Sequence, residues 1–316
     1  YGAYLQDELA VAPDWDLTLG TRYTHAEATA HQVADPFDSL LAVKNALPVK
    51  RGWDNLSSNA RLLWKATPRT HPFAGISQGF RAPNLSDLTQ FDAARSGEVN
   101  IPSPDLDPEE YLAKEIGLKH RDPKFSGQAA YYHTEIRHAI ERAPTGALSG
   151  TSRVVQRLNV GRGYVQGVEL EGSVRLDRAW TLFANTQWQE GGIDTYVTSN
   201  PADQDMRPMS RIAPRSALLG GRWEASGRLN PWLEATGQFV DGQDRISPDD
   251  ALDTQRIPPG GSIGYNVFSI RGGIEVRPGT TLALAAENLT DKDYRVLGSG
   301  TNAPGRNFVL TVDSRF

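Results

Sequence analysis

The sequence offers three kinds of side chain that can hold a ligand: histidine, arginine and aspartate. It contains six histidines and no cysteine, which excludes disulfides, thiolate zinc sites and cysteine nucleophiles from this chain. Imidazole is a common ligand of haem iron. Guanidinium pairs with carboxylates and catecholates and stacks on rings, whereas carboxylates bind hard cations such as Ca²⁺. Which of these groups act together depends on the elements that carry them.

Four of the six histidines lie in or beside the long polar segments of the chain. They are His25, His31, His133 and His138. We single out His133 and His138 as candidate ligand contacts, with haem as the chemistry they would suit. Their spacing fixes no pair geometry, so the simpler alternative of polar loop histidines without a ligand stays open.

Arginines are the second candidate group, because an anionic ligand would favour them. Those in the long polar segments are Arg95, Arg153, Arg157, Arg162, Arg207 and Arg211. We single out Arg81, Arg95 and Arg157 as ligand contacts. The alternative is that these side chains form a solvated loop surface or contact lipopolysaccharide.

Metal, enzyme and nucleic-acid chemistry find little support. Asp249, Asp250 and Asp253 lie close together but lack the spacing and fixed glycine of a calcium loop, so we predict a charged loop and no metal site. The chain has no nucleophile elbow, phosphate loop, His-Glu-x-x-His or dinucleotide fingerprint, so we predict no catalytic residue and no cofactor. Lys and Arg number 33 against 38 Asp and Glu, without a basic block, which argues against nucleic acid.

The elements that carry these residues show two-residue alternation over segments of roughly ten residues, the length of a tilted membrane-crossing strand. In residues 180–190, Trp180, Leu182 and Trp188 fall on one face, and Asn185 and Gln187 fall on the other. No run of about 18 apolar residues occurs, so no transmembrane helix is predicted. Alternating apolar and polar faces instead suit a barrel with a lipid-facing exterior and a wet interior.

Counting such segments predicts about thirteen strands. They lie near 1–11, 15–27, 55–66, 70–80, 110–121, 125–137, 163–176, 180–190, 216–225, 230–240, 265–276, 280–288 and 306–316. An odd number of antiparallel strands cannot close into a barrel, so we expect part of a larger one.

The connections alternate in length. Short turns lie at 12–14, 67–69, 122–124, 177–179, 226–230 and 277–279, and long polar segments lie at 28–54, 81–109, 138–162, 191–215, 241–264 and 289–305. Short periplasmic turns opposite long extracellular loops are typical of outer-membrane barrels. A soluble β-sandwich or propeller is the alternative, but it has no reason to alternate its loop lengths.

The last strand ends in an aromatic residue. Phe308, Leu310, Val312 and Phe316 share one face. Such an ending resembles the signal that outer-membrane barrels present to their assembly machinery.

Several motifs, in order along the chain, resemble TonB-dependent outer-membrane receptors. They are 4–8 (YLQDE), 19–23 (LGTRY), 79–88 (GFRAPNLSDL), 106–109 (LDPE), 114–119 (KEIGLK), 165–170 (VQGVEL) and 286–294 (AENLTDKDY), the last followed by a glycine-rich loop and 304–306 (PGR). Haem receptors of the family often carry a histidine and an Asn-Pro-Asn-Leu motif after Phe-Arg-Ala-Pro. Here residues 103–106 read SPDL and no histidine intervenes, which argues against haem.

The resemblance implies an all-β fold: an antiparallel transmembrane barrel of about 22 strands, of which residues 1–316 are the C-terminal part. It implies an N-terminal plug and a TonB-binding box outside this chain, and uptake of a ferric siderophore, haem or cobalamin across a Gram-negative outer membrane. The implied partners are TonB, outer-membrane lipid and lipopolysaccharide, the barrel assembly machinery and a small nutrient. A passive porin or a structural or adhesion barrel is the alternative.

Overall fold

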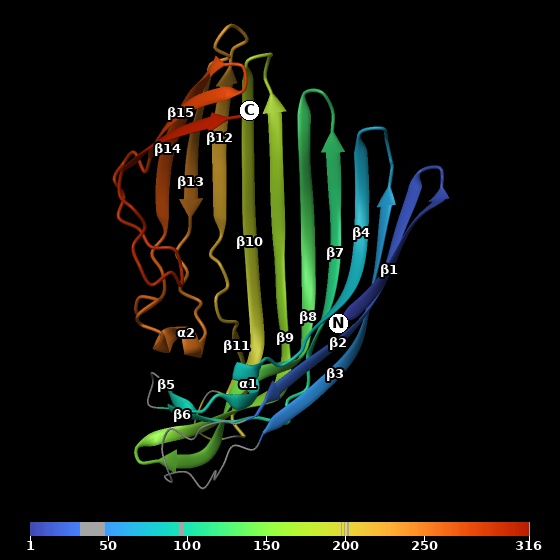
Figure 1. Cartoon of the computed structure of the whole chain (residues 1–316), viewed down its shortest axis with the longest axis vertical. Helices are drawn as coiled ribbons and strands as arrows, with labels where there is room; N and C mark the ends of the chain where they lie inside the picture. The colour runs from blue at the N-terminus through green and yellow to red at the C-terminus, as the bar shows by residue number, and fades with distance from the viewer. Residues whose placement is uncertain (32–47, 95–97, 197, 199, 201, 316) are drawn as a thin grey trace.

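The computed structural model describes residues 1–31, 48–94, 98–196, 198, 200 and 202–315 (Figure 1). Across these residues one long path of antiparallel strands forms a curved wall. Its thirteen strands, in order, are β1 (Gly2–Ala12), β2 (Trp15–Ala30), β3 (Val49–Trp64), β4 (Thr70–Arg81), β7 (Glu109–Arg121), β8 (Phe125–Ser149), β9 (Ser152–Arg175), β10 (Trp180–Tyr196), β12 (Ser216–Glu224), β13 (Trp232–Val240), β14 (Tyr265–Arg277), β15 (Thr280–Glu287) and β16 (Asn307–Ser314). The predicted series of strands and short turns is therefore confirmed.

The remaining described elements are short and lie in the long connections. They are β5 (Asp92–Ala94), β6 (Glu98–Ile101), β11 (Gln204–Pro208), α1 (Leu85–Thr89) and α2 (Pro248–Leu252). None of the helices in the described part of the chain is long and apolar enough to cross a membrane.

The register separates an apolar face from a polar one. Leu182 pairs with Val174 on one side and Gly221 on the other, which places these three positions on the same face. Trp15 and Trp64 stack on this face near the short turns, with ring centroids 5.5 Å apart. Aromatic rings at that height suit the bilayer interface. On the opposite face Glu234 lies between Arg222 and Arg271. The apolar face is therefore the lipid-facing exterior.

The wall does not close. In the strand path, β1 and β16 lie at opposite ends, and neither pairs with the other in the described residues. In Figure 1 the sheet is an open, curved wall with the short turns at the top and the long connections at the bottom. This arrangement agrees with part of a larger barrel.

The prediction that 138–162 is a loop is wrong. β8 and β9 pair from Phe125↔Val174 to Ser149↔Ser152, so the hairpin extends well beyond the last β7 pair, Glu110↔Arg137. The extension carries polar and apolar side chains on both faces, because it packs against other loops rather than lipid, and so it shows no alternation. The prediction that the third strand begins at residue 55 is wrong for the same reason, because β3 begins at Val49.

The hairpin bends where it leaves the wall. His138 and Gly161 both have positive φ, 53° and 44°, and the pairing passes from Arg137↔Arg162 directly to Ala139↔Val160. Asn159 holds the bend by donating to the carbonyl oxygens of His138, at 2.8 Å, and Asp107, at 2.7 Å. The bend turns the hairpin end sideways, beside β5 and β6 (Figure 1).

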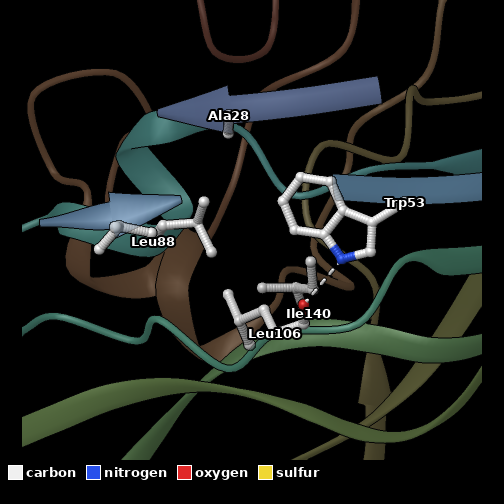
Figure 2. Close-up of a cluster of buried hydrophobic side chains, with 6 residues drawn as sticks. Ala28, Trp53, Leu88, Leu106 and Ile140 are labelled. Carbon is white, nitrogen blue, oxygen red and sulfur yellow. Dashed lines mark hydrogen bonds between the residues drawn. The ribbon is translucent and has the colours of Figure 1, made fainter. Parts of the chain in front are cut away.

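The long connections have a hydrophobic core of their own (Figure 2). It consists of Ala28, Val49, Trp53, Leu88, Leu106 and Ile140. The Trp53 Nε1–H donates to the Leu106 carbonyl oxygen at 3.2 Å, which satisfies the indole in an apolar setting. The ends of β2 and β3 farthest from the short turns, helix α1 and the β8–β9 hairpin are thereby packed together into one folded cap.

Candidate functional site

Three connections meet at the end of the wall opposite the short turns. They are the segment with α1, β5 and β6, the bent end of the β8–β9 hairpin, and the loop that carries α2. The first and second join directly, because β6 pairs in parallel with β9 from Glu98↔Arg153 to Ile101↔Gln156. The site is built from the polar side chains between these connections.

The Asp87 carboxylate organises the first connection. Asn84 caps α1 by accepting from the Asp87 N–H at 2.9 Å, and the Asp87 side chain accepts from the Asn84 N–H at 3.1 Å, which forms a capping box. The same carboxylate binds Arg81 Nη1 at 2.7 Å and Arg157 Nη1 at 3.2 Å. Arg81 also binds Glu109 at 2.6 Å. Strand β4, helix α1 and the hairpin are thus joined by charge-assisted bonds.

Glu98 performs a similar role in β6. Its carboxylate contacts Arg142 Nη1 at 3.2 Å and also Arg153, which come from the two strands of the hairpin. The Glu98 side chain is 7% exposed, so its charge depends on these partners.

The third connection is held by aspartates at the start of α2. Ser247 caps the helix by accepting from the Asp250 N–H at 3.0 Å. Asp249 binds Arg142 Nη2 at 2.6 Å, which ties α2 to the hairpin. Asp250 binds Arg211 at 3.3 Å, and the same guanidinium binds Asp253 at 2.7 Å. The three aspartates noted in the sequence are therefore ion-paired, and no group of metal-ligating side chains occurs in the described ranges.

Two adjoining cavities lie between these connections. The larger, about 540 Å³, is bounded by β5, β6, the hairpin, Arg211 and α2. The smaller, about 290 Å³, is bounded by the hairpin, β10 and the start of α2. Glu141, Arg142, Ser210, Asp249 and Leu252 line both. Both cavities have mixed walls, in which charged and polar side chains stand beside apolar ones such as Leu252.

Glu141 is the most perturbed acid of the cavities. The pKa of its carboxyl group is raised from 4.5 to about 7. Burial is the main cause, and the negative charge of the nearby Asp249 is the second. Its side chain accepts from the Thr195 hydroxyl at 3.4 Å, which only partly offsets the loss of water. The site therefore contains a carboxyl group that changes charge near neutral pH.

The structure brings two of the predicted ligand contacts together. Arg81 and Arg157 share Asp87, and Arg157 also lines the larger cavity. His138 lies at the bend of the hairpin, where its side chain is exposed. His133 lies on the outward face with Tyr131 and Gln166, stacked on Tyr164 at 6.0 Å, away from both cavities.

The predicted site residues and those that the structure brings together do not fully coincide. Arg95 and Phe316 lie outside the described residues. Sequence reasoning missed Asp87, Glu141, Arg142 and Asp249 as site residues. A signal was present for Asp87, because Asn84 and Asp87 have the spacing of a capping box.

Comparison with known proteins gives a consistent family. The family model described as "TonB dependent receptor-like, beta-barrel" matches residues 1–289. The chain is 23% identical over 329 residues to the "Iron-regulated outer membrane virulence protein" of Vibrio cholerae serotype O1, which covers all of this chain and 44% of that protein. It is 23% identical over 348 residues to "Hemoglobin-haptoglobin utilization protein B" of Neisseria meningitidis serogroup C, covering 95% of this chain and 42% of that protein.

The structural comparison agrees on the fold. The solved "Copper transporter OprC" superposes with a TM-score of 0.76 at 21% identity, covering all of this chain and 48% of that one. The chain therefore spans less than half the length of each of these three proteins.

Proposed function

Because this chain belongs to the TonB-dependent receptor-like β-barrel family of Gram-negative outer membranes, we propose that it forms part of a receptor that takes up a scarce nutrient. Residues 1–316 would be the C-terminal part of its barrel, with a plug and a TonB-binding box elsewhere in the receptor. TonB would supply the energy for uptake, and no chemistry on the ligand is expected.

The observation that carries the proposal is the folded cap at the extracellular end of the wall. A passive pore needs only a lining, whereas here α1, the β8–β9 hairpin and α2 are tied by ion pairs around cavities of about 540 and 290 Å³. Preorganised polar groups around a cavity favour specific binding over free diffusion.

The ligand class is supported only at the level of the family. Among the similar proteins one is named for iron regulation, one for hemoglobin-haptoglobin utilisation and one for copper transport. A ferric siderophore, haem or cobalamin remains our proposal for this receptor. Arg81, Arg157 and His138 are proposed to act at or beside the cavities, and Arg95 and His133 remain candidates without a structural argument.

The outer surface suggests the other partners. Leu219 and Leu310 on the apolar face are 52% and 66% exposed, as lipid contact requires. Near the extracellular ends of the strands, Lys114, Glu135 and Gln166 lie on the outward face with His133. We propose that this belt contacts lipopolysaccharide.

The test is nutrient uptake by cells that carry or lack the complete receptor gene, each with and without TonB. The probes are labelled ferric siderophores, haem and cyanocobalamin, supplied singly under starvation. We expect uptake of one probe to require both the receptor and TonB. Uptake that needs the receptor but not TonB would favour a passive porin, and no receptor-dependent uptake would favour a structural or adhesion barrel.

A further inference from the structure

The two cavities of the cap share part of their lining, and this shared part includes an ion pair between two loops. Arg142 comes from the β8–β9 hairpin and Asp249 from the first turn of α2, and their side chains meet at 2.6 Å. Both residues line both cavities. The ion pair therefore lies on the boundary across which the larger and smaller spaces adjoin.

We propose that the Arg142–Asp249 ion pair is a gate, whose opening joins the two cavities into one chamber for the ligand. The inference rests on the proposed receptor function, and it assigns the α2 loop as the moving part. The hairpin is the fixed part, because Arg142 also binds Glu98 and the hairpin is paired to β6.

The α2 side of the bridge is the weaker side. Asp249 is 52% exposed, and Arg142 is its one ion partner among the residues that the structure describes, whereas Asp250 is 5% exposed and binds both Ser210 and Arg211. Breaking a half-exposed ion pair has a small free-energy cost, while pulling Asp250 from its partners has a large one. Opening would therefore start at Asp249, and the Asp250 contacts would limit how far α2 moves.

The charges that face the bridge favour partner exchange. Glu141 lies beside Arg142 and is close enough to Asp249 for repulsion, and Glu98 already shares the Arg142 guanidinium. A guanidinium with several acceptors in reach keeps a partner when one acceptor leaves. Arg142 would thus stay paired to Glu98 when α2 moves, so that opening leaves no unpaired buried cation.

A buried reporter in the smaller cavity measures the opening without any ligand. Val155 lines that cavity and is 3% exposed, and the chain has no cysteine of its own. A V155C change in the complete receptor, with any cysteine elsewhere replaced by serine, supplies a thiol that maleimide reaches only through an open cavity. Labelling is measured on intact cells, and correct folding is checked by heat-modifiable migration.

The decisive comparison is V155C with and without Asp249→Asn. We expect D249N to speed labelling about fivefold, the effect of losing an ion pair worth about 1 kcal/mol. Asp249→Glu keeps the carboxylate and should label slowly. Asp244→Asn makes the same charge change at an exposed position of the same loop and should also label slowly.

Two results would overturn the gate. One is an unchanged labelling rate in D249N, and the other is equal acceleration by D244N, which would mean general loosening of the loop. A thiol at Leu148, exposed at the hairpin end, should label quickly in every variant and reports on reagent access alone. Because no nutrient is added, this outcome is independent of the uptake test of the proposed function.

Discussion

Arg81 and Arg157 bind opposite oxygens of one carboxylate, Asp87, although the first ends a wall strand and the second lies in the bent hairpin. Asp87 is 6% exposed, so both guanidinium contacts work at reduced dielectric. The pairing fixes the position of the hairpin relative to the wall. The two arginines therefore hold the hairpin side of the larger cavity in place, and Arg157 lines that cavity, whether or not either contacts a ligand.

Replacing Asp87 should loosen the cap without unfolding the wall. Asp87→Asn keeps the side-chain shape but leaves two arginines with a neutral partner, which should cost about 2 kcal/mol. We expect protease cleavage within residues 85–106 to accelerate about 30-fold. The control is Asp105→Asn, because Asp105 is 89% exposed and its pair with Arg51 should contribute little. Equal rates of protease cleavage in the two variants would contradict the role of Asp87.

Leu88 should carry much of the hydrophobic stability of the cap. Its side chain is fully buried in the core shown in Figure 2, whereas Leu85 of the same helix is 47% exposed. Leu88→Ala should destabilise the cap by about 3 kcal/mol, and Leu85→Ala by less than about 0.5 kcal/mol. Hydrogen exchange of residues 85–106 measures both variants. Similar exchange in the two would show that the cap does not depend on this core.

The wall was predictable because lipid imposes a rule on every strand. A lipid-facing position must be apolar and its neighbour faces the wet interior, so strands such as Trp180–Tyr196 show their alternation directly. The turns were equally clear, because Pro, Gly, Asp and Asn mark them. No such rule governs the cap, where the β8–β9 extension packs on both faces.

The sequence predicted some residues of the site but not the contacts between them. Arg81 and Arg157 were identified by residue type, but their shared acceptor is a matter of tertiary structure. The motif at 286–294 is another case. It supported the family resemblance, but the sequence did not show what the motif does in the fold. Asn288 adopts φ 49° and donates to the carbonyl oxygens of Lys292 and Pro304, so it fixes the loop after β15.

Glu141 should make the cap sensitive to pH. Its pKa is raised from 4.5 to about 7, so between these values the folded state keeps a proton that the unfolded state has lost. Glu141 therefore leaves the free energy of unfolding of the cap unchanged below about pH 4.5. That free energy falls as the pH rises to 7, and above pH 7 it stays lower by about 2 kcal/mol. We expect hydrogen exchange in residues 138–162 and 241–264, corrected for intrinsic rates, to be faster at pH 8 than at pH 5.5.

The matched variants separate Glu141 from other acids. Glu141→Gln mimics the protonated form and should abolish the pH difference by protecting the cap at pH 8. Glu110→Gln removes an exposed carboxylate of β7 and should leave the difference intact. A pH difference that survives in E141Q would assign the effect to another group.

The proposed assembly signal can be separated from simple lipid contact because Leu310 pairs with Leu284 on the same outward face. The two side chains are 66% and 56% exposed, so changing either to serine removes a similar lipid contact. Of the two, only Leu310 belongs to the last strand, β16, where Phe308 and Val312 share its face. If that face is read by the assembly machinery, L310S should lower the amount of heat-modifiable receptor in the outer membrane several-fold more than L284S. Equal losses would mean that Leu310 acts only through its contact with lipid.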